Sequence, residues 1–564
     1  MKRNTLTTAV LAGLTGMAGM VSVSNAVNVN PDGLGQVLLY PYYSARGDNA
    51  TLISIVNTTE RGKAVKIRFI EALNSREVLD FNIYMSPFDV WTAGVLANDD
   101  GGAKMVTSDQ TCTVPYFAGG DGEQDFLTIE LDDGGPADAE RTMSGYIEVI
   151  EMGTLLPTPN PEEGVPSPAD ESYIAHAVKH VGGVPNDCDH LVDQWTENLD
   201  PEPNNPTAND LQWVSGLFDW GFDTEIGPSG GLFGAGSIIN VEEGVLFSYN
   251  ATPIDGFWTT DHPHEHTDPA SLFPNLADGN EDISNVFAGG AVFSHDWSGA
   301  GDSAPVAAVN AVLMYNQVLN EYVTEPDAGA RTEWVMTFPT KRFHTDAAGG
   351  LVGEDQPVPP FTSTWNNGTD LSPACEVFAF TTPEDFDEYF VTTGSRAFDR
   401  EERPDIDPPE LEEPRPPVVS PPIPDDDDND VPDPTLFQLC REANVVRFSL
   451  DEEVEDLPAY TEILKEPQRE GTVLGYSNFD IEFDAGWVRF DLAEIGTSGD
   501  RRRTEPGENI NTRAMEQLEG LPVIGFAVST FANGELASGV LSNYGGTFNH
   551  RGSRSIVEYD DLDD

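Results

Sequence analysis

Basic residues are scarce in this chain of 564 residues. It has 29 Lys and Arg against 97 Asp and Glu, a formal net charge of −68 at pH 7. Phosphate backbones and anionic lipids are bound by clustered Lys and Arg, so we exclude nucleic acid and anionic membrane as partners. Two explanations of the acidity stay open. One is a calcium-dependent or matrix-binding surface; the other, which we favour, is the general acidity of proteins from saline habitats.

Cysteine is scarcer still, with only Cys112, Cys188, Cys375 and Cys440. Their spacing contains no CxxC and no CxxCH, so we expect neither a typical cysteine metal site nor covalently attached haem. An even number of cysteines in an exported chain indicates disulfides. Of the three possible pairings we favour Cys112–Cys188 and Cys375–Cys440, because each closes a loop rich in proline, glycine and acidic residues.

Long hydrophobic runs are absent after the N-terminus. Lys2 and Arg3 precede an uncharged stretch of apolar and small residues from Leu6 to Val21, and Ser24–Ala26 has small residues at the positions of a cleavage site. This pattern is typical of a secretory signal peptide, which we assign to residues 1–26. We expect no membrane span after its cleavage. We predict a secreted protein, extracellular or at the cell surface, with the periplasm as the alternative.

Glycine, proline and short alternating segments are abundant. The chain has 53 Gly and 42 Pro. We predict strands at residues 36–43, 51–57, 64–72, 78–85, 90–95 and 144–152. In the third segment Val65, Ile67 and Phe69 alternate with Lys66 and Arg68, which predicts a strand buried on one face only. Strands at such short intervals indicate a mainly β fold with an immunoglobulin-like β-sandwich, a second β-rich region and a few capping helices.

The composition divides the mature chain into four parts. Residues 27–154 form the predicted N-terminal sandwich, 155–398 a β-rich region with helices, and 435–564 the strands that complete that second β region. Between them, 399–434 is an acidic, proline-rich loop that cannot bury enough apolar surface to fold alone. In the second part, Val306–Leu319 predicts a helix that is apolar nearly all round.

Three histidines alternate in residues 261–268 (DHPHEHTD). On a strand, His262, His264 and His266 would point the same way, as three ligands of Zn²⁺ or Cu²⁺ would. The competing interpretation is an exposed His-rich loop, which Pro263 and Pro269 favour because proline disrupts a regular strand.

Calcium is the best-supported cofactor, although we assign none with certainty. Asp278, Asn280 and Asp282 supply the hard oxygen ligands that Ca²⁺ prefers, as does the acidic run at residues 425–430. Neither segment fits the twelve-residue EF-hand loop. A weak atmosphere of ions is therefore favoured over a single tight site.

No catalytic arrangement stands out. Gly227–Gly231 (GPSGG) and Ala175–Ala177 (AHA) are only faintly similar to the nucleophile and histidine segments of trypsin-like proteases, and no matching barrel pattern precedes them. No Walker lysine follows the glycines. Acids are too numerous for the sequence to single out a carboxylate pair for glycoside hydrolysis. We therefore name no catalytic residue.

Five segments resemble a family of uncharacterised secreted proteins from Gram-negative bacteria. They are Val29–Tyr43 (VNPDGLGQVLLYPYY), Ser54–Thr59 (SIVNTT), Asn74–Phe81 (NSREVLDF), Trp334–Phe343 (WVMTFPTKRF) and Leu521–Phe526 (LPVIGF). The resemblance spans most of the mature chain and implies a common fold and an exported life. It implies no activity, because none is established for that family.

Together these observations predict an exported, acidic structural or adhesion protein of the cell surface or extracellular matrix, without catalysis. Its expected partners are other exported or envelope proteins, or polysaccharide. The alternatives are an extracellular hydrolase that degrades a polymer and a periplasmic ligand-binding protein.

Overall fold

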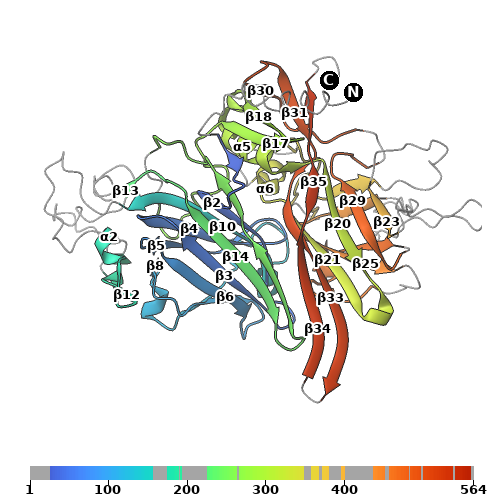
Figure 1. Cartoon of the computed structure of the whole chain (residues 1–564), viewed down its shortest axis with the longest axis horizontal. Coiled ribbons are helices and arrows are strands. Elements are labelled where there is room, and N and C mark those ends of the chain that lie inside the picture. Colours follow the sequence, from blue (N-terminus) through green and yellow to red (C-terminus); the bar gives the residue numbers. More distant parts are fainter. Residues whose placement is uncertain are drawn as a thin grey trace, which may run out of the picture.

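The computed structural model describes most of the chain between residues 26 and 559. The described residues are 26–155, 174–189, 191–192, 225–262, 266–347, 357–367, 371–379, 395–400, 436–450, 457–481, 483–496, 500–537 and 540–559. Strands dominate them, so the mainly β class is confirmed (Figure 1). The predicted signal peptide, except Ala26, and the acidic loop after residue 400 lie outside the described residues.

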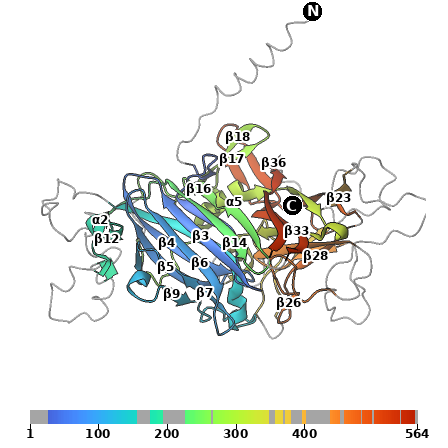
Figure 2. The same cartoon turned by 60° about the horizontal axis from the view of Figure 1, so that its bottom comes forward.

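Two antiparallel sheets form the N-terminal sandwich (Figures 1 and 2). Sheet 1 has the order β1 (Asn28–Val29), β16 (Thr252–Asp255), β2 (Val37–Ser44), β10 (Ser144–Leu155), β4 (Gly62–Glu71), β5 (Glu77–Met85) and β8 (Cys112–Val114), and β13 (Glu225–Ile226) also pairs with β10. Sheet 2 has the order β15 (Val245–Asn250), β14 (Leu232–Asn240), β3 (Asn49–Asn57), β6 (Val90–Ala97), β7 (Ala103–Val106) and β9 (Glu123–Asp125). The six strands predicted from alternation correspond to β2, β3, β4, β5, β6 and β10.

The sandwich includes strands from both sides of residue 154, where we had placed a boundary. β14 pairs with β3 from Leu232 opposite Asn57 to Asn240 opposite Asn49. β16 likewise lies between β1 and β2. Tyr40, Trp91 and Ile238 belong to one buried hydrophobic core that both sheets share. The N-terminal sandwich is therefore complete only with the strands that end at residue 255.

The outward side of β4 departs from the prediction. Lys66 and Arg68 were expected to face solvent, yet every residue of β4 is buried. The cover comes from the segment at residues 266–275: Lys66 Nζ donates a hydrogen bond to the Pro269 carbonyl at 2.7 Å, and the amide of Asn82 on β5 donates to the Thr267 carbonyl at 2.8 Å. The prediction of a half-buried strand was wrong because this cover is distant in the sequence.

Two further sheets form a second sandwich. Sheet 3 has the order β28 (Ser477–Ile481), β25 (Ala443–Leu450), β21 (Ala330–Thr337), β33 (Ile524–Ala537) and β34 (Val540–Asn549), and sheet 4 the order β23 (Arg396–Asp399), β29 (Ala485–Asp491), β20 (Gln317–Val323) and β35 (Arg551–Ser553). Trp334, Phe448 and Phe490 pack between them. The other face of sheet 3 packs on the N-terminal sandwich, where the rings of Phe526 and Tyr249 stack at 4.7 Å.

A third layer joins the two sandwiches. Its sheet has the order β17 (Ile283–Ala288), β18 (Ala291–Asp296), β30 (Gly507–Asn509), β31 (Met515–Glu519) and β36 (Ser555–Glu558). Helix α5 (Ala304–Leu313) packs against β17 and is buried along most of its length. We had predicted this helix to continue to Leu319. It ends at Leu313 because Met314 turns to an extended conformation and the chain joins β20.

The remaining elements are short. They are α2 (Ile174–Ala177), α6 (Lys341–Thr345), β11 (His180–Val181) with β12 (Val184–Pro185), β19 (Met314–Tyr315) with β32 (Leu521–Pro522), β22 (Glu376–Ala379) with β24 (Leu436–Leu439), β26 (Arg469–Glu470) with β27 (Val473–Leu474), and 3₁₀ turns at Phe117–Gly119, Ala139–Met143, Ser298–Ser303 and Pro326–Ala328.

The disulfides join Cys112 to Cys188 and Cys375 to Cys440. This is the pairing that the sequence favoured.

Candidate functional site

The described histidines of the predicted metal motif have separate surroundings. The His262 ring stacks on Trp258 with centroids 4.5 Å apart, and its Nδ1 lies 2.7 Å from the amide nitrogen of Asn280. His266 is buried and hydrogen-bonded to the Tyr84 hydroxyl on β5. His264 lies outside the described residues. Within the described part of the chain, no three His, Cys, Asp or Glu side chains gather as metal ligands.

The predicted calcium ligands at residues 278–282 take part in hydrogen bonds within their own segment and with Thr259 and Trp297. Asp278 Oδ2 accepts from the backbone N–H of Asn275 at 2.7 Å, and Asn280 Oδ1 accepts from that of Thr259 at 2.8 Å. The backbone carbonyl of Asp282 accepts from the Trp297 N–H at 2.9 Å. These contacts shape a turn and do not converge on one point. The acidic run at 425–430 lies outside the described residues.

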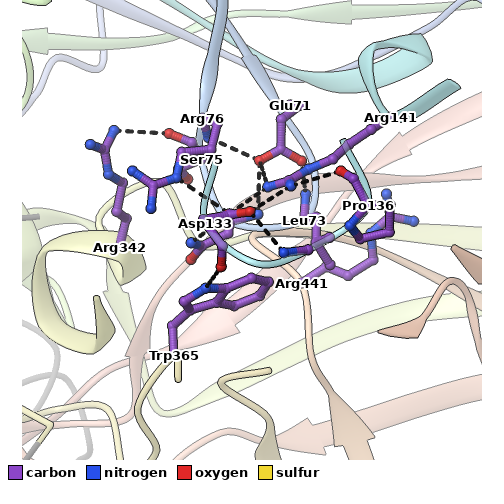
Figure 3. A network of polar contacts seen from close by, with 12 residues as sticks. Glu71, Leu73, Ser75, Arg76, Asp133, Pro136, Arg141, Arg342, Trp365 and Arg441 are labelled. Carbon is purple, nitrogen blue, oxygen red and sulfur yellow. Dashed lines mark hydrogen bonds and ion pairs between the residues drawn. The ribbon is translucent and has the colours of Figure 1, made fainter. Parts of the chain in front are cut away.

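A network of buried charges lies where the turn after β4 meets residues 133–141 (Figure 3). The Glu71 carboxylate accepts hydrogen bonds from Arg141 Nη2 at 2.9 Å and from the backbone N–H groups of Leu73, Asn74 and Arg76 at 2.6–2.9 Å. Asp133 holds the same Arg141 guanidinium through both oxygens, each at 2.7 Å. This bidentate geometry is the strongest form of such a pair.

The charges in this network are buried, and each carboxylate pairs with a guanidinium. Burial alone would raise the pKa of the Glu71 carboxyl, but the Arg141 guanidinium outweighs burial and holds that pKa below its usual value. Burial also acts to raise the pKa of Asp133, but the hydrogen bonds and positive charge of Arg141 hold that pKa well below its usual range. Arg76 extends the network to Asp346 at 2.9 Å. Such a network fixes the turn in one geometry and exposes no reactive group.

A second network joins residues 42–46 to residues 441–470. Arg46, just after β2, contacts Glu470 at 3.0 Å, and Arg441 contacts Glu466 at 2.8 Å and Glu470 at 3.1 Å. The Tyr42 hydroxyl donates to Glu466 at 2.6 Å. Sequence reasoning missed this cluster because its partners lie up to 424 positions apart. Its side chains are buried, so its role is structural.

The outer face of sheet 2, in contrast to the two charged networks, carries no charged side chain on four of its strands. Its strands β15, β14, β3 and β6 contain no Asp, Glu, Lys or Arg, in a chain of which 22% is charged. Apolar side chains point outward from it: Leu52 is 46% exposed, Leu246 51% and Phe233 41%. Val90 and Leu96 on β6 are exposed as well. We call these five outward residues and the strands that carry them the uncharged face.

The uncharged face continues onto a neighbouring strand on one side and is bordered by a carboxylate on the other. β34 lies beside β15, also contains no charged residue, and exposes Tyr544. On the opposite side lies the carboxylate of Asp109. It accepts hydrogen bonds from the backbone N–H and hydroxyl of Thr92 on β6. An apolar patch bordered by polar residues is typical of an interaction surface.

Comparisons of the chain with protein-family models, curated proteins and solved structures found no match. A search of the described helices for one long and apolar enough to cross a membrane also found none.

Proposed function

We propose that this is an exported, non-catalytic structural or adhesion protein that assembles with other exported proteins of the cell envelope or matrix through the uncharged face. The observation that carries the proposal is the absence of charge from four adjacent strands of a protein whose net charge is −68. Solubility alone favours charge on an exposed sheet, so an uncharged, apolar sheet surface indicates a partner. The secretory signal and the resemblance to secreted proteins support the location.

The proposed partner is an exported protein with an uncharged, apolar surface. No side chain of the uncharged face can form an ion pair with a charged partner, which argues against recognition by charge. Two copies of this chain would bring two strongly acidic bodies together, and they repel each other at low ionic strength. A different protein with less charge meets no such repulsion.

The test is binding of the purified mature protein to intact cells and purified envelopes of the source organism, with and without Ca²⁺. We expect the variant Leu52→Asp/Leu246→Asp to lose most of its binding, because it places two carboxylates on strands β3 and β15 of the uncharged face. The matched control is Ile129→Asp, which adds a carboxylate at an isolated residue that is 77% exposed. Equal binding by all three proteins, or a defined homo-oligomer that only the double variant loses, would overturn the proposal.

The competing functions have their own readouts. A polymer-degrading hydrolase would release products in a panel of polysaccharide and protein substrates, and turnover at ordinary enzymatic rates would refute a non-catalytic role. The acidity of the protein also allows binding to depend weakly on Ca²⁺. The comparison of binding with and without Ca²⁺ measures this dependence directly.

A further inference from the structure

A cavity of about 250 Å³ lies outside sheet 1, between the N-terminal sandwich and helix α6. Its polar walls include Arg68 and Glu148 of sheet 1, Tyr146 of β10 and Arg342 of α6. Its apolar walls include Phe343 and the exposed pair Leu272 and Phe273. At roughly 30 Å³ per water molecule, the volume suits a small organic molecule.

The positive charges around this cavity are paired with acids, with one exception. Arg68 contacts Glu77 at 2.5 Å and also pairs with Glu148. Arg76, which lies next to the cavity, pairs with Asp133 and Asp346.

Arg342 differs from these neighbours. Its Nη1 donates one hydrogen bond, to the Ser75 carbonyl at 3.0 Å (Figure 3). Its Nε is buried without a hydrogen bond, and Nη2 makes none to the described residues. No carboxylate of the described chain forms an ion pair with it. The Nε–Nη2 edge, which binds carboxylates in a two-pronged geometry, is therefore left unused.

The Arg342 guanidinium is partly buried and has no ionic partner among the described residues. Burial, together with the nearby Arg76 and Arg68, lowers the pKa of the Arg342 guanidinium, which stays protonated at neutral pH. A carboxylate bound in the cavity would offset the cost of the partial burial of Arg342. The lining of the cavity carries two guanidiniums, Arg68 and Arg342, and Arg68 is the one that the carboxylates Glu148 and Glu77 neutralise.

We propose that this cavity binds a small organic acid, whose carboxylate pairs with Arg342 and whose apolar part packs on Leu272, Phe273 and Phe343. The ligand contacts sheet 1 on one side and α6 on the other, so it joins the two parts of the fold. The site does not involve the uncharged face, and its function is independent of assembly there.

The probes are benzoate and acetate, titrated at constant ionic strength with chloride as the balancing anion. We expect benzoate to raise the Tm and to bind with a stoichiometry of one by calorimetry, because a ligand of the native state stabilises it by mass action. Benzoate should bind more tightly than acetate, because its ring buries additional apolar area. Chloride alone should produce no such shift.

The variants separate the site from general charge effects. Arg342→Met should weaken benzoate binding by roughly 10- to 100-fold, the loss expected for charge-assisted hydrogen bonds. It should change the Tm of the ligand-free protein little, because Arg342 forms no ion pair there and only one hydrogen bond, to the Ser75 carbonyl. Arg342→Lys keeps the charge but loses the two-pronged geometry, so it should bind with intermediate affinity. Arg61→Met removes a cation at an exposed turn and should bind like the wild type.

Absence of binding by either acid to the wild type would overturn the proposal. Equal affinity of Arg342→Met and wild type, or equal stabilisation by chloride, would do so as well.

Discussion

Glu442 offers a sharp test of how charge is buried in this protein. Its side chain is 1% exposed, and Oε2 makes no hydrogen bond. Burial is the main cause that raises the pKa of Glu442 to about 8, with Glu71 adding to the shift and Lys341 opposing it. In the unfolded chain the same carboxyl titrates near 4.5. The native protein therefore holds a proton here that the unfolded chain has released.

The sign and size of the effect follow from this difference. Because the pKa is higher in the folded state, the free energy of unfolding falls as pH rises from about 4.5 to about 8. Each unit of difference between the folded and unfolded pKa corresponds to about 1.4 kcal/mol. Between pH 5 and pH 9 the free energy of unfolding therefore falls by about 4 kcal/mol. Glu442→Gln cannot ionise and escapes this loss. Relative to wild type, the variant should gain stability as pH rises, by up to that amount.

Urea denaturation of wild type and Glu442→Gln at pH 5, 7 and 9 and constant salt measures the gain. Glu60→Gln, in an exposed turn, is the matched control and should follow the wild type at every pH. Parallel pH profiles for wild type and Glu442→Gln would refute the reasoning, because they would mean that the Glu442 carboxyl titrates alike in both states.

Two further predictions concern the buried networks. Arg141→Met should reduce the free energy of unfolding by about 3–5 kcal/mol, because it leaves Glu71 and Asp133 buried without their cation; a loss below about 1 kcal/mol in urea titrations would contradict this. Burial opposes ionisation of Glu466, but Arg441 and Arg46 lower its pKa to about 2. The contribution of the Glu466 carboxylate to the free energy of unfolding is therefore complete above about pH 4.5 and disappears as pH falls towards 2. Glu466→Gln should therefore be less stable than wild type at pH 7 and approach it at pH 2, measured by acid titration of circular dichroism; a constant difference would contradict the assignment.

The local features of the fold were predictable because they depend on neighbouring residues. Alternation located six strands of the N-terminal sandwich, and the loop compositions favoured the observed disulfide pairs. What covers a strand was not predictable. Lys66 and Arg68 have the spacing of a solvent-facing row, but the return of residues 266–275 covers Lys66, and Arg68 pairs with Glu77 and Glu148. The end of α5 was missed for a similar reason, since the pairing of β20 with β29 overrides the helical pattern.

The candidate sites show the same limit. The histidine motif was visible in sequence, but the neighbours of His262 and His266 come from other parts of the chain. Arg342 lies in a segment singled out for its resemblance to secreted proteins, with no sign that its charge would lack an acid. The uncharged face left a signal that sequence reasoning passed over: several strands without charge in an acidic chain.

The late strands of the N-terminal sandwich set an order of events for a chain that emerges from its N-terminus first. Until residues 232–255 emerge, β3 and β2 each have one edge with unpaired backbone groups. Open edges of this kind recruit strands from other molecules. Over the synthesis of nearly two hundred residues beyond β3, these edges therefore stay open to pairing with strands of other nascent copies.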